Sequence, residues 1–289
     1  MPNIDTLDLA VGIPSYNEAD NIGFVVRQVA AGLEKYFPDL NTVIINADNF
    51  SQGGTKDAFI AADSGRIPKV YLSTPAGVKG KGNNFRNLFN YLLPYHPKAV
   101  VVVDADLRSI RPEWVRYLGR TVFKGFDFVT PLYCRNEYDG TITNQLCYPL
   151  LYSVLGRDIR QPIGGDFAFS GRLLEHWMSQ DWDENVLQYG VDVFMTTEVM
   201  FQRGIFRISA AGWAEIVFSF LAAYAAQSDR EQQLGIVEAL KPLYFARTVS
   251  FIWETLELDP VDSERKLLQQ AQTFWAKRSA LLDSQAAVA

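Results

Sequence analysis

The stretch from Ala99 to Ile110 reads AVVVVDADLRSI, and it decides the fold class. Four consecutive valines are typical of a strand that is buried on both faces of a sheet. A carboxylate is costly to bury there, yet the run leads directly into Asp104 and Asp106. Residues i and i+2 of an extended chain lie on the same side, so both carboxylates can face one point. The stretch predicts a buried strand that ends in two functional carboxylates.

The segments before this strand alternate between strand-like and helix-like patterns. Strands are expected over Leu7–Ile13, Thr42–Ile45, Val70–Leu72 and Val100–Val103. Helices are expected over Ile22–Leu33, Thr55–Ala62 and Asn83–Leu93. This alternation predicts an α/β fold with a mainly parallel sheet and helices on both faces. Ligands of such sheets bind beyond the carboxyl ends of the strands, where Asp104 and Asp106 are expected.

The pattern changes after Pro131. Helices are expected over Ile142–Leu155 and from Asp192 to Gln202, with a glycine-rich joint, QPIGGD, between them. Beyond Gly212 the chain looks wholly helical. We therefore predict one catalytic-type α/β domain over residues 1–212 and a helical C-terminal extension over residues 213–289.

The composition argues against nucleic-acid-binding, disulfide-rich and membrane-spanning proteins. The 289 residues are 48% apolar and 21% charged, as in a globular protein, and a net charge of −6 argues against a nucleic-acid partner. Cys134 and Cys147 are too few for a disulfide framework and are expected to be free thiols. The start of the sequence lacks a signal-peptide pattern, and no apolar run reaches the length of a membrane span. We expect a cytoplasmic protein without an integral membrane segment.

The aspartate pair favours a metal site. Two carboxylates this close repel each other unless a cation lies between them, and oxygen ligands suit Mg²⁺ or Mn²⁺. The alternative is structural: one aspartate caps the helix expected at Pro112 and the other is a surface acid.

The stretch Gly77–Phe85, GVKGKGNNF, places Lys79 and Lys81 among three glycines just before a helix. Backbone amides, a helix N-terminus and a lysine together suit a pyrophosphate, although the spacing is not that of a P-loop. The alternative is a plain surface loop.

Polar residues follow the first two strands in PSYNEADN and ADNFSQGGT. Asn17, Glu18, Asp48 and Asn49 lie where a parallel sheet would hold a base and a ribose, or they act only as caps and turn formers.

Further along, QPIGGDFAFSG and YGVDVFMTTE supply two glycines that permit close backbone approach and two more carboxylates, Asp166 and Asp192. The alternative is a tight turn and a helix cap. His96 and His176 have no metal-ligand spacing and are expected to be structural.

Taken in order, these motifs resemble the nucleotide-sugar glycosyltransferases of the GT-A fold. KGKGNNF, VDADLRSIRPEW, QPIGGDFAFSG and YGVDVFMTTEV are together similar to the retaining glucosyl-3-phosphoglycerate and mannosylglycerate synthases. The resemblance runs from about Ala10 to Arg207.

The resemblance implies a role for each matching residue. The nucleotide sugar would be held by Pro14, Tyr16, Asn17, Glu18, Asp48, Lys81, Asp104 and Ala105. Asp104 and Asp106 would bind Mg²⁺ or Mn²⁺. The catalytic group beside the donor sugar and the acceptor would comprise Gly164, Gly165, Asp166, Tyr189 and Asp192, with Asp166 where the family usually has glutamate.

The activity so implied is metal-dependent transfer of a hexose, with retention, from a nucleotide-diphosphate sugar to glycerate or 3-phosphoglycerate. A homodimer is compatible with it. Three alternatives remain: a lipid or polysaccharide acceptor, a sugar-phosphate nucleotidyltransferase, and a non-catalytic nucleotide-sugar-binding homologue. The nucleotidyltransferase would need a glycine-rich, arginine-bearing loop after the first strand, and PSYNEADN has neither residue type.

One departure from the family concerns a third metal ligand, a histidine that usually follows the strand expected over Ile205–Ala210. The sequence FRISAAGWAEIVF offers none. Our hypothesis is that a mobile loop on the acceptor side, which closes when substrate binds, belongs between Ala210 and Glu215 and is missing from the chain. The alternative is that the protein binds the metal with fewer ligands.

Overall fold

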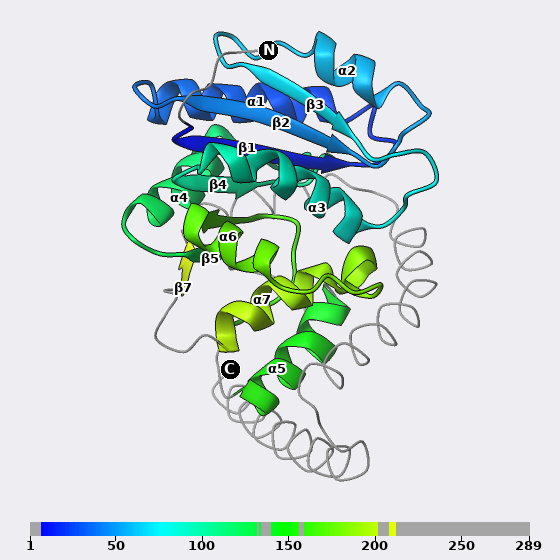
Figure 1. The fold of residues 1–289 in the computed structure, drawn as a ribbon. Coiled ribbons are helices and arrows are strands. Elements are labelled where there is room, and N and C mark those ends of the chain that lie inside the picture. The colour runs from blue at the N-terminus through cyan, green and yellow to red at the C-terminus, as the bar shows by residue number, and fades with distance from the viewer. Residues whose placement is uncertain (1–6, 132, 134–139, 156–158, 202–207, 212–289) are drawn as a thin grey trace, which may run out of the picture.

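A computed structural model describes residues 7–131, 133, 140–155, 159–201 and 208–211. The helical extension expected over residues 213–289 and Cys134 lie outside the described residues, and so do residues 212–215 of the segment in which a missing loop is expected. Within them the fold has three layers, a twisted sheet with helices on both faces (Figure 1). The predicted α/β class is confirmed.

In the described part of the chain the sheet has seven strands, in the order β3-β2-β1-β4-β6-β5-β7. Neighbouring strands are parallel except β6, which runs antiparallel to β4 and to β5. The strands are β1 (Leu9–Ser15), β2 (Thr42–Asp48), β3 (Lys69–Ser73), β4 (Ala99–Val102), β5 (Phe128–Pro131), β6 (Phe167–Ser170) and β7 (Ile208–Ala211). The carboxyl ends of β1, β2 and β4 therefore meet at one edge of the sheet.

Two hydrophobic cores hold the layers together, because side chains of the buried strands alternate between the two faces. One core packs the sheet against α1, α2 and α4, and the other packs it against α3, α5, α6 and α7. The helices are α1 (Ile22–Tyr36), α2 (Thr55–Ala61), α3 (Lys81–Leu92), α4 (Pro112–Phe123), α5 (Tyr148–Leu155), α6 (Gly171–Ser179) and α7 (Val191–Phe201). Three short helical segments complete the order: η1 (Leu93–Tyr95), η2 (Ile142–Cys147) and η3 (Val186–Gly190).

The expected elements are present with shifted ends. Strand β1 begins at Leu9 rather than Leu7, because pairing with both neighbours starts there, and it continues to Ser15. The helix expected from Ile142 is first π-helical, as η2, and becomes α-helical only at Tyr148. The four-residue strands β5 and β6 were not predicted, because neither carries a long apolar run.

Among the residues that the structure describes, no helix is long and apolar enough to cross a membrane. Cys147 is a free, buried thiol, as predicted.

Candidate active site

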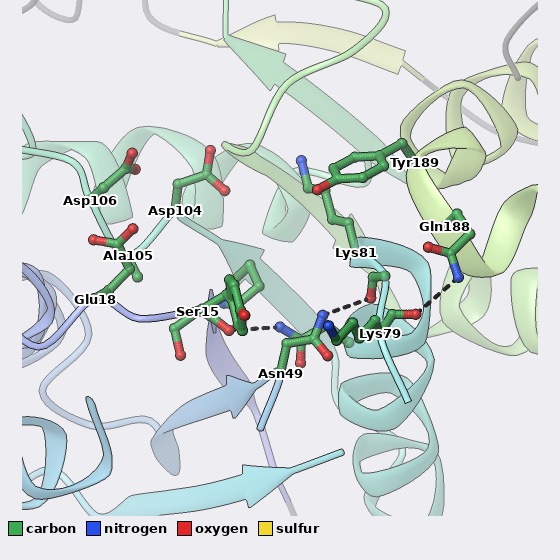
Figure 2. A pocket seen from close by; sticks show the side chains of 14 residues that line it. Ser15, Glu18, Asn49, Lys79, Lys81, Asp104, Ala105, Asp106, Gln188 and Tyr189 are labelled. Atoms are coloured by element: carbon green, nitrogen blue, oxygen red, sulfur yellow. Dashed lines mark hydrogen bonds between the residues drawn. The ribbon is translucent and has the colours of Figure 1, made fainter. Parts of the chain in front are cut away.

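A cavity of about 660 Å³ opens at the carboxyl edge of the sheet, beyond β1 and β4. This volume is in the range that binds small molecules and cofactors. Its walls come from the ends of β1, β2 and β4, from the start of α3 and from η3 (Figure 2). The lining residues are Pro14, Ser15, Tyr16, Glu18, Asn49, Lys79, Gly80, Lys81, Asn84, Asp104, Ala105, Asp106, Gln188 and Tyr189.

The carboxylates of Glu18, Asp104 and Asp106 gather on one side of this cavity, and Lys81 and Tyr189 lie on the other (Figure 2). Desolvation, and then the negative charges of Asp104 and Glu18, raise the pKa of Asp106 to about 6. The three carboxylates thus form a site of concentrated negative potential that a cation would relieve.

The structural alternative for the aspartate pair is wrong in its helix cap. Helix α4 begins at Pro112, and its N-cap is Arg111, which makes no side-chain cap. Neither Asp104 nor Asp106 therefore caps this helix. Both line the cavity instead.

The two aspartates fit a divalent cation by donor type, since carboxylate oxygens are the ligands that Mg²⁺ and Mn²⁺ prefer. Across the described part of the chain, no group of three or more histidine, cysteine, aspartate or glutamate side chains is arranged to hold a metal ion. Two protein ligands leave most coordination positions of the ion to water and to substrate oxygens, which is how Mg²⁺ is commonly held beside phosphates.

Lys81 is the first residue of α3, at the helix end that attracts anions. Its Nζ lies 3.1 Å from Oδ2 of Asp192, the second residue of α7. Asp192 is buried and does not line the cavity, so the structure places it behind Lys81. Asp192 therefore holds Lys81 at this position. The ion pair joins two of the motifs that resemble the family, KGKGNNF and YGVDVFMTTEV.

The glycines before and within α3 serve close packing rather than flexibility. Gly80 has a φ of 120°, and a Cβ at Gly82 would lie 1.8 Å from the carbonyl oxygen of Val186. The start of α3 therefore lies directly against η3. Gln188 fixes the contact further, because its Nε2 donates to the carbonyl oxygen of Lys79 at 3.0 Å.

Asp48 lies beneath the cavity and does not line it. Its carboxylate accepts hydrogen bonds from the Ser15 hydroxyl, from both the backbone N–H and the hydroxyl of Ser51, and from the Tyr71 hydroxyl. Asn17 is exposed outside the lining, and its backbone N–H donates to the Ser51 hydroxyl. Asp48 thus holds together the turns that shape this end of the cavity.

Gly164, Gly165 and Asp166 do not line the cavity either. Asp166 is buried behind Asp104, and desolvation together with the charge of Asp104 raises the pKa of Asp166 to about 7. The histidines lie elsewhere: His96 pairs with Glu175, and His176 pairs with Glu198 between α6 and α7.

Four lining residues were not individual candidates from the sequence: Ser15, Gly80, Asn84 and Gln188. Asn84 lies one helical turn after Lys81, and Gln188 directly precedes Tyr189. Their positions beside Lys81 and Tyr189 could have indicated these two residues. The polarity of the sequence alone does not predict which side of α3 faces the cavity.

Comparisons with known proteins identify a family for this chain. The family model described as "Mannosylglycerate synthase, GT domain" matches residues 25–215. No curated protein sequence matches the chain.

Solved structures share the fold at low sequence identity. Glucosyl-3-phosphoglycerate synthase from Mycobacterium tuberculosis, solved with Mn²⁺, UDP and phosphoglyceric acid, is 21% identical with a TM-score of 0.57, over 84% of this chain and 78% of that one. Mannosyl-3-phosphoglycerate synthase from Rubrobacter xylanophilus is 20% identical with a TM-score of 0.59, over 88% and 77%. The mycobacterial enzyme has also been solved with Mg²⁺ and UDP.

Proposed function

The chain belongs to the family of mannosylglycerate synthase glycosyltransferase domains, and on that premise we propose that it transfers a hexose, with retention and with a divalent metal, from a nucleotide-diphosphate sugar to glycerate or 3-phosphoglycerate. The observation that carries the proposal is the cavity, where Asp104, Asp106 and Glu18 face Lys81 at the carboxyl edge of the sheet. This combination suits a diphosphate bound together with a cation.

The likeness to solved glycosyltransferases supports the donor assignment. The mycobacterial enzyme has been solved in complexes with UDP or UDP-glucose, Mn²⁺ and phosphoglyceric acid. In this chain Asp104 and Asp106 would hold the metal, which stabilises the negative charge that develops on the departing diphosphate. Lys81, at the N-terminus of α3, would bind the diphosphate oxygens opposite the metal.

The other lining residues would position the sugar nucleotide. Asn49 donates through Nδ2 to the carbonyl oxygen of Gly80 at 3.2 Å, so it links the turn after β2 to the lysine loop. Tyr16 and Tyr189 are large exposed side chains on the cavity wall and offer ring faces to a base or a sugar. We assign no protein nucleophile to the retaining step.

The test is donor turnover and product identity. UDP- and GDP-linked glucose and mannose are incubated with Mn²⁺ or with EDTA, and with glycerate, 3-phosphoglycerate or a lipid acceptor. We expect Mn²⁺-dependent formation of an α-glycoside of one of the two small acids, identified by NMR from the anomeric coupling.

Matched substitutions of a carboxylate make this test specific. Asp106→Asn should abolish turnover, whereas Asp39→Asn should not, because Asp39 is exposed just before β2, at the opposite end of the strands. Transfer to the lipid alone would establish the alternative acceptor class. Donor binding without turnover would establish a non-catalytic binding homologue.

A further inference from the structure

A buried tyrosine and a buried carboxylate lie directly behind Asp104. The Tyr133 hydroxyl donates to Oδ2 of Asp166, and Oδ1 of Asp166 accepts from the backbone N–H of Asp104 at 3.3 Å. Both oxygens of Asp166 are thereby engaged by the protein. Asp166 is only 6% exposed and Tyr133 only 9%, so solvent does not replace these bonds.

The sheet register explains why these groups meet. Strand β6 pairs antiparallel with β4, with Val102 opposite Phe167. Asp166 and Gly165 precede Phe167, so they lie beside Val103 and Asp104, which follow the end of β4. Asp104 and Asp166 are thus in contact although they lie 62 positions apart in sequence.

Gly165 forms the surface against which the Asp104 side chain packs. A Cβ added at Gly165 would lie 1.6 Å from Oδ2 and 1.9 Å from Cγ of Asp104. Only a glycine leaves room for the carboxylate in this orientation. Both the backbone and the side chain of Asp104 are therefore set by the segment before β6.

Tyr133 is itself fixed by helix α4, with which it shares one hydrophobic core. Its ring packs against Trp114 of α4, with centroids 6.4 Å apart, and Trp114 is only 1% exposed. An anchored ring gives its hydroxyl a defined direction toward Asp166. The contacts therefore form a continuous chain from α4 through Tyr133 and Asp166 to Asp104.

We propose that Tyr133 and Asp166 are positioning residues, which hold Asp104 in the orientation that binds the metal of the donor complex. This inference rests on the metal-dependent donor binding proposed above. It assigns Asp166 a role through Asp104 rather than a contact with the sugar or the acceptor. Tyr133, which the motif analysis did not single out, becomes part of the functional site.

The test measures metal-dependent nucleotide affinity in matched variants. Tyr133→Phe removes only the hydroxyl and keeps the ring packed on Trp114. Asp166→Asn removes one acceptor and keeps the shape. The control is Tyr36→Phe, which loses a similar bond, 2.7 Å from the Tyr36 hydroxyl to Glu113, between α1 and α4. Affinities for UDP and GDP are measured by titration calorimetry in Mn²⁺ and in EDTA, with the fold checked by circular dichroism.

We expect Tyr133→Phe and Asp166→Asn each to weaken the Mn²⁺-dependent binding of the nucleotide about tenfold, or about 1.4 kcal/mol. Binding in EDTA should stay unchanged, and so should both affinities of Tyr36→Phe. The double variant should bind no more weakly than Asp166→Asn, because both changes break the same contact.

Two results would overturn this inference while the proposed function stands: Tyr133→Phe with the Mn²⁺ affinity of the wild type, or an equal loss in Mn²⁺ and in EDTA. A wild-type protein that binds both nucleotides equally with and without Mn²⁺ would instead overturn the proposed function, and the positioning role with it.

Discussion

The ion pair between Lys81 and Asp192 yields a prediction about stability that separates its two partners. The side chain of Asp192 is 3% exposed, whereas that of Lys81 is 22% exposed and reaches the cavity. Replacing Lys81 with methionine keeps the length of the side chain but leaves a carboxylate buried opposite an apolar group. Replacing Asp192 with asparagine leaves an ammonium that can still be hydrated from the cavity.

The magnitudes follow from this asymmetry. Breaking a buried pair by removing one partner typically costs 3–5 kcal/mol, and the partial exposure of Lys81 puts Lys81→Met at the lower end, about 3 kcal/mol. That corresponds to a fall of about 6–12 °C in the melting temperature for a domain of this size. Asp192→Asn should cost about 1 kcal/mol, as for the loss of one hydrogen bond.

The assay is denaturant unfolding of the wild type, both single variants and the double variant. We expect the double variant to be more stable than Lys81→Met alone, because the buried carboxylate that would face the apolar methionine is then a neutral amide. Equal losses from the two single variants, or strictly additive losses in the double variant, would refute the assignment of Asp192 as the buried partner.

Four further predictions concern the cavity and the helix α3 beside it. Asp106→Ala should weaken Mn²⁺-dependent binding of a nucleoside diphosphate at least tenfold in calorimetry, about 1.4 kcal/mol; unchanged affinity would contradict the metal assignment. The pKa of Asp106 is raised to about 6, so Mn²⁺ binding should weaken as the pH falls through 6, because protons then compete with the metal. The metal-free protein should lose stability as the pH rises from about 4 through 6, because the folded state then binds more protons than the unfolded state. Asp106→Ala should reduce this dependence of stability on pH. Lys81→Ala should weaken diphosphate binding more than Lys79→Ala does, since only Lys81 stands at the helix N-terminus, and equal effects would indicate a diffuse basic loop. Gly82→Ala should destabilise the fold by about 1–3 kcal/mol in thermal unfolding through its clash with η3, whereas Gly53→Ala, with its nearest neighbour 3.9 Å away, should be silent.

The parts of the site that could be predicted are those that depend on one strand and its end. The valine run fixes β4, and the parallel topology then brings Asp104 and Asp106 to the edge where β1 and β2 also end. Lys81 follows the same logic, because an α/β pattern predicts a helix start near it. Periodicity and the strand-end rule are enough for these residues, since both act within a single segment and the unit that follows it.

Other roles depend on partners that are distant in sequence. The glycines beside Lys81 look like a flexible phosphate loop in the sequence, yet Gly82 is required by a contact with Val186. Asp48 looks like a ligand for a ribose, but its oxygens accept from Ser15, Ser51 and Tyr71. A polar residue at a strand end is equally compatible with a ligand and with a protein partner, and only the packed structure distinguishes them.

Strand β6 determines how the Asp104 carboxylate is oriented, and it is the least visible element in the sequence. Its four residues carry no long apolar pattern, and its direction opposes that of β4. Because it is inserted antiparallel between β4 and β5, the residues just before it run past the end of β4, and Gly165 reaches the Asp104 carboxylate. A parallel strand in the same place would bring its opposite end to this edge, and Asp166 would lie far from Asp104. The reversed direction of one short strand thus converts the segment 164–166, which looks in the sequence like a second wall of the active site, into the support of the first.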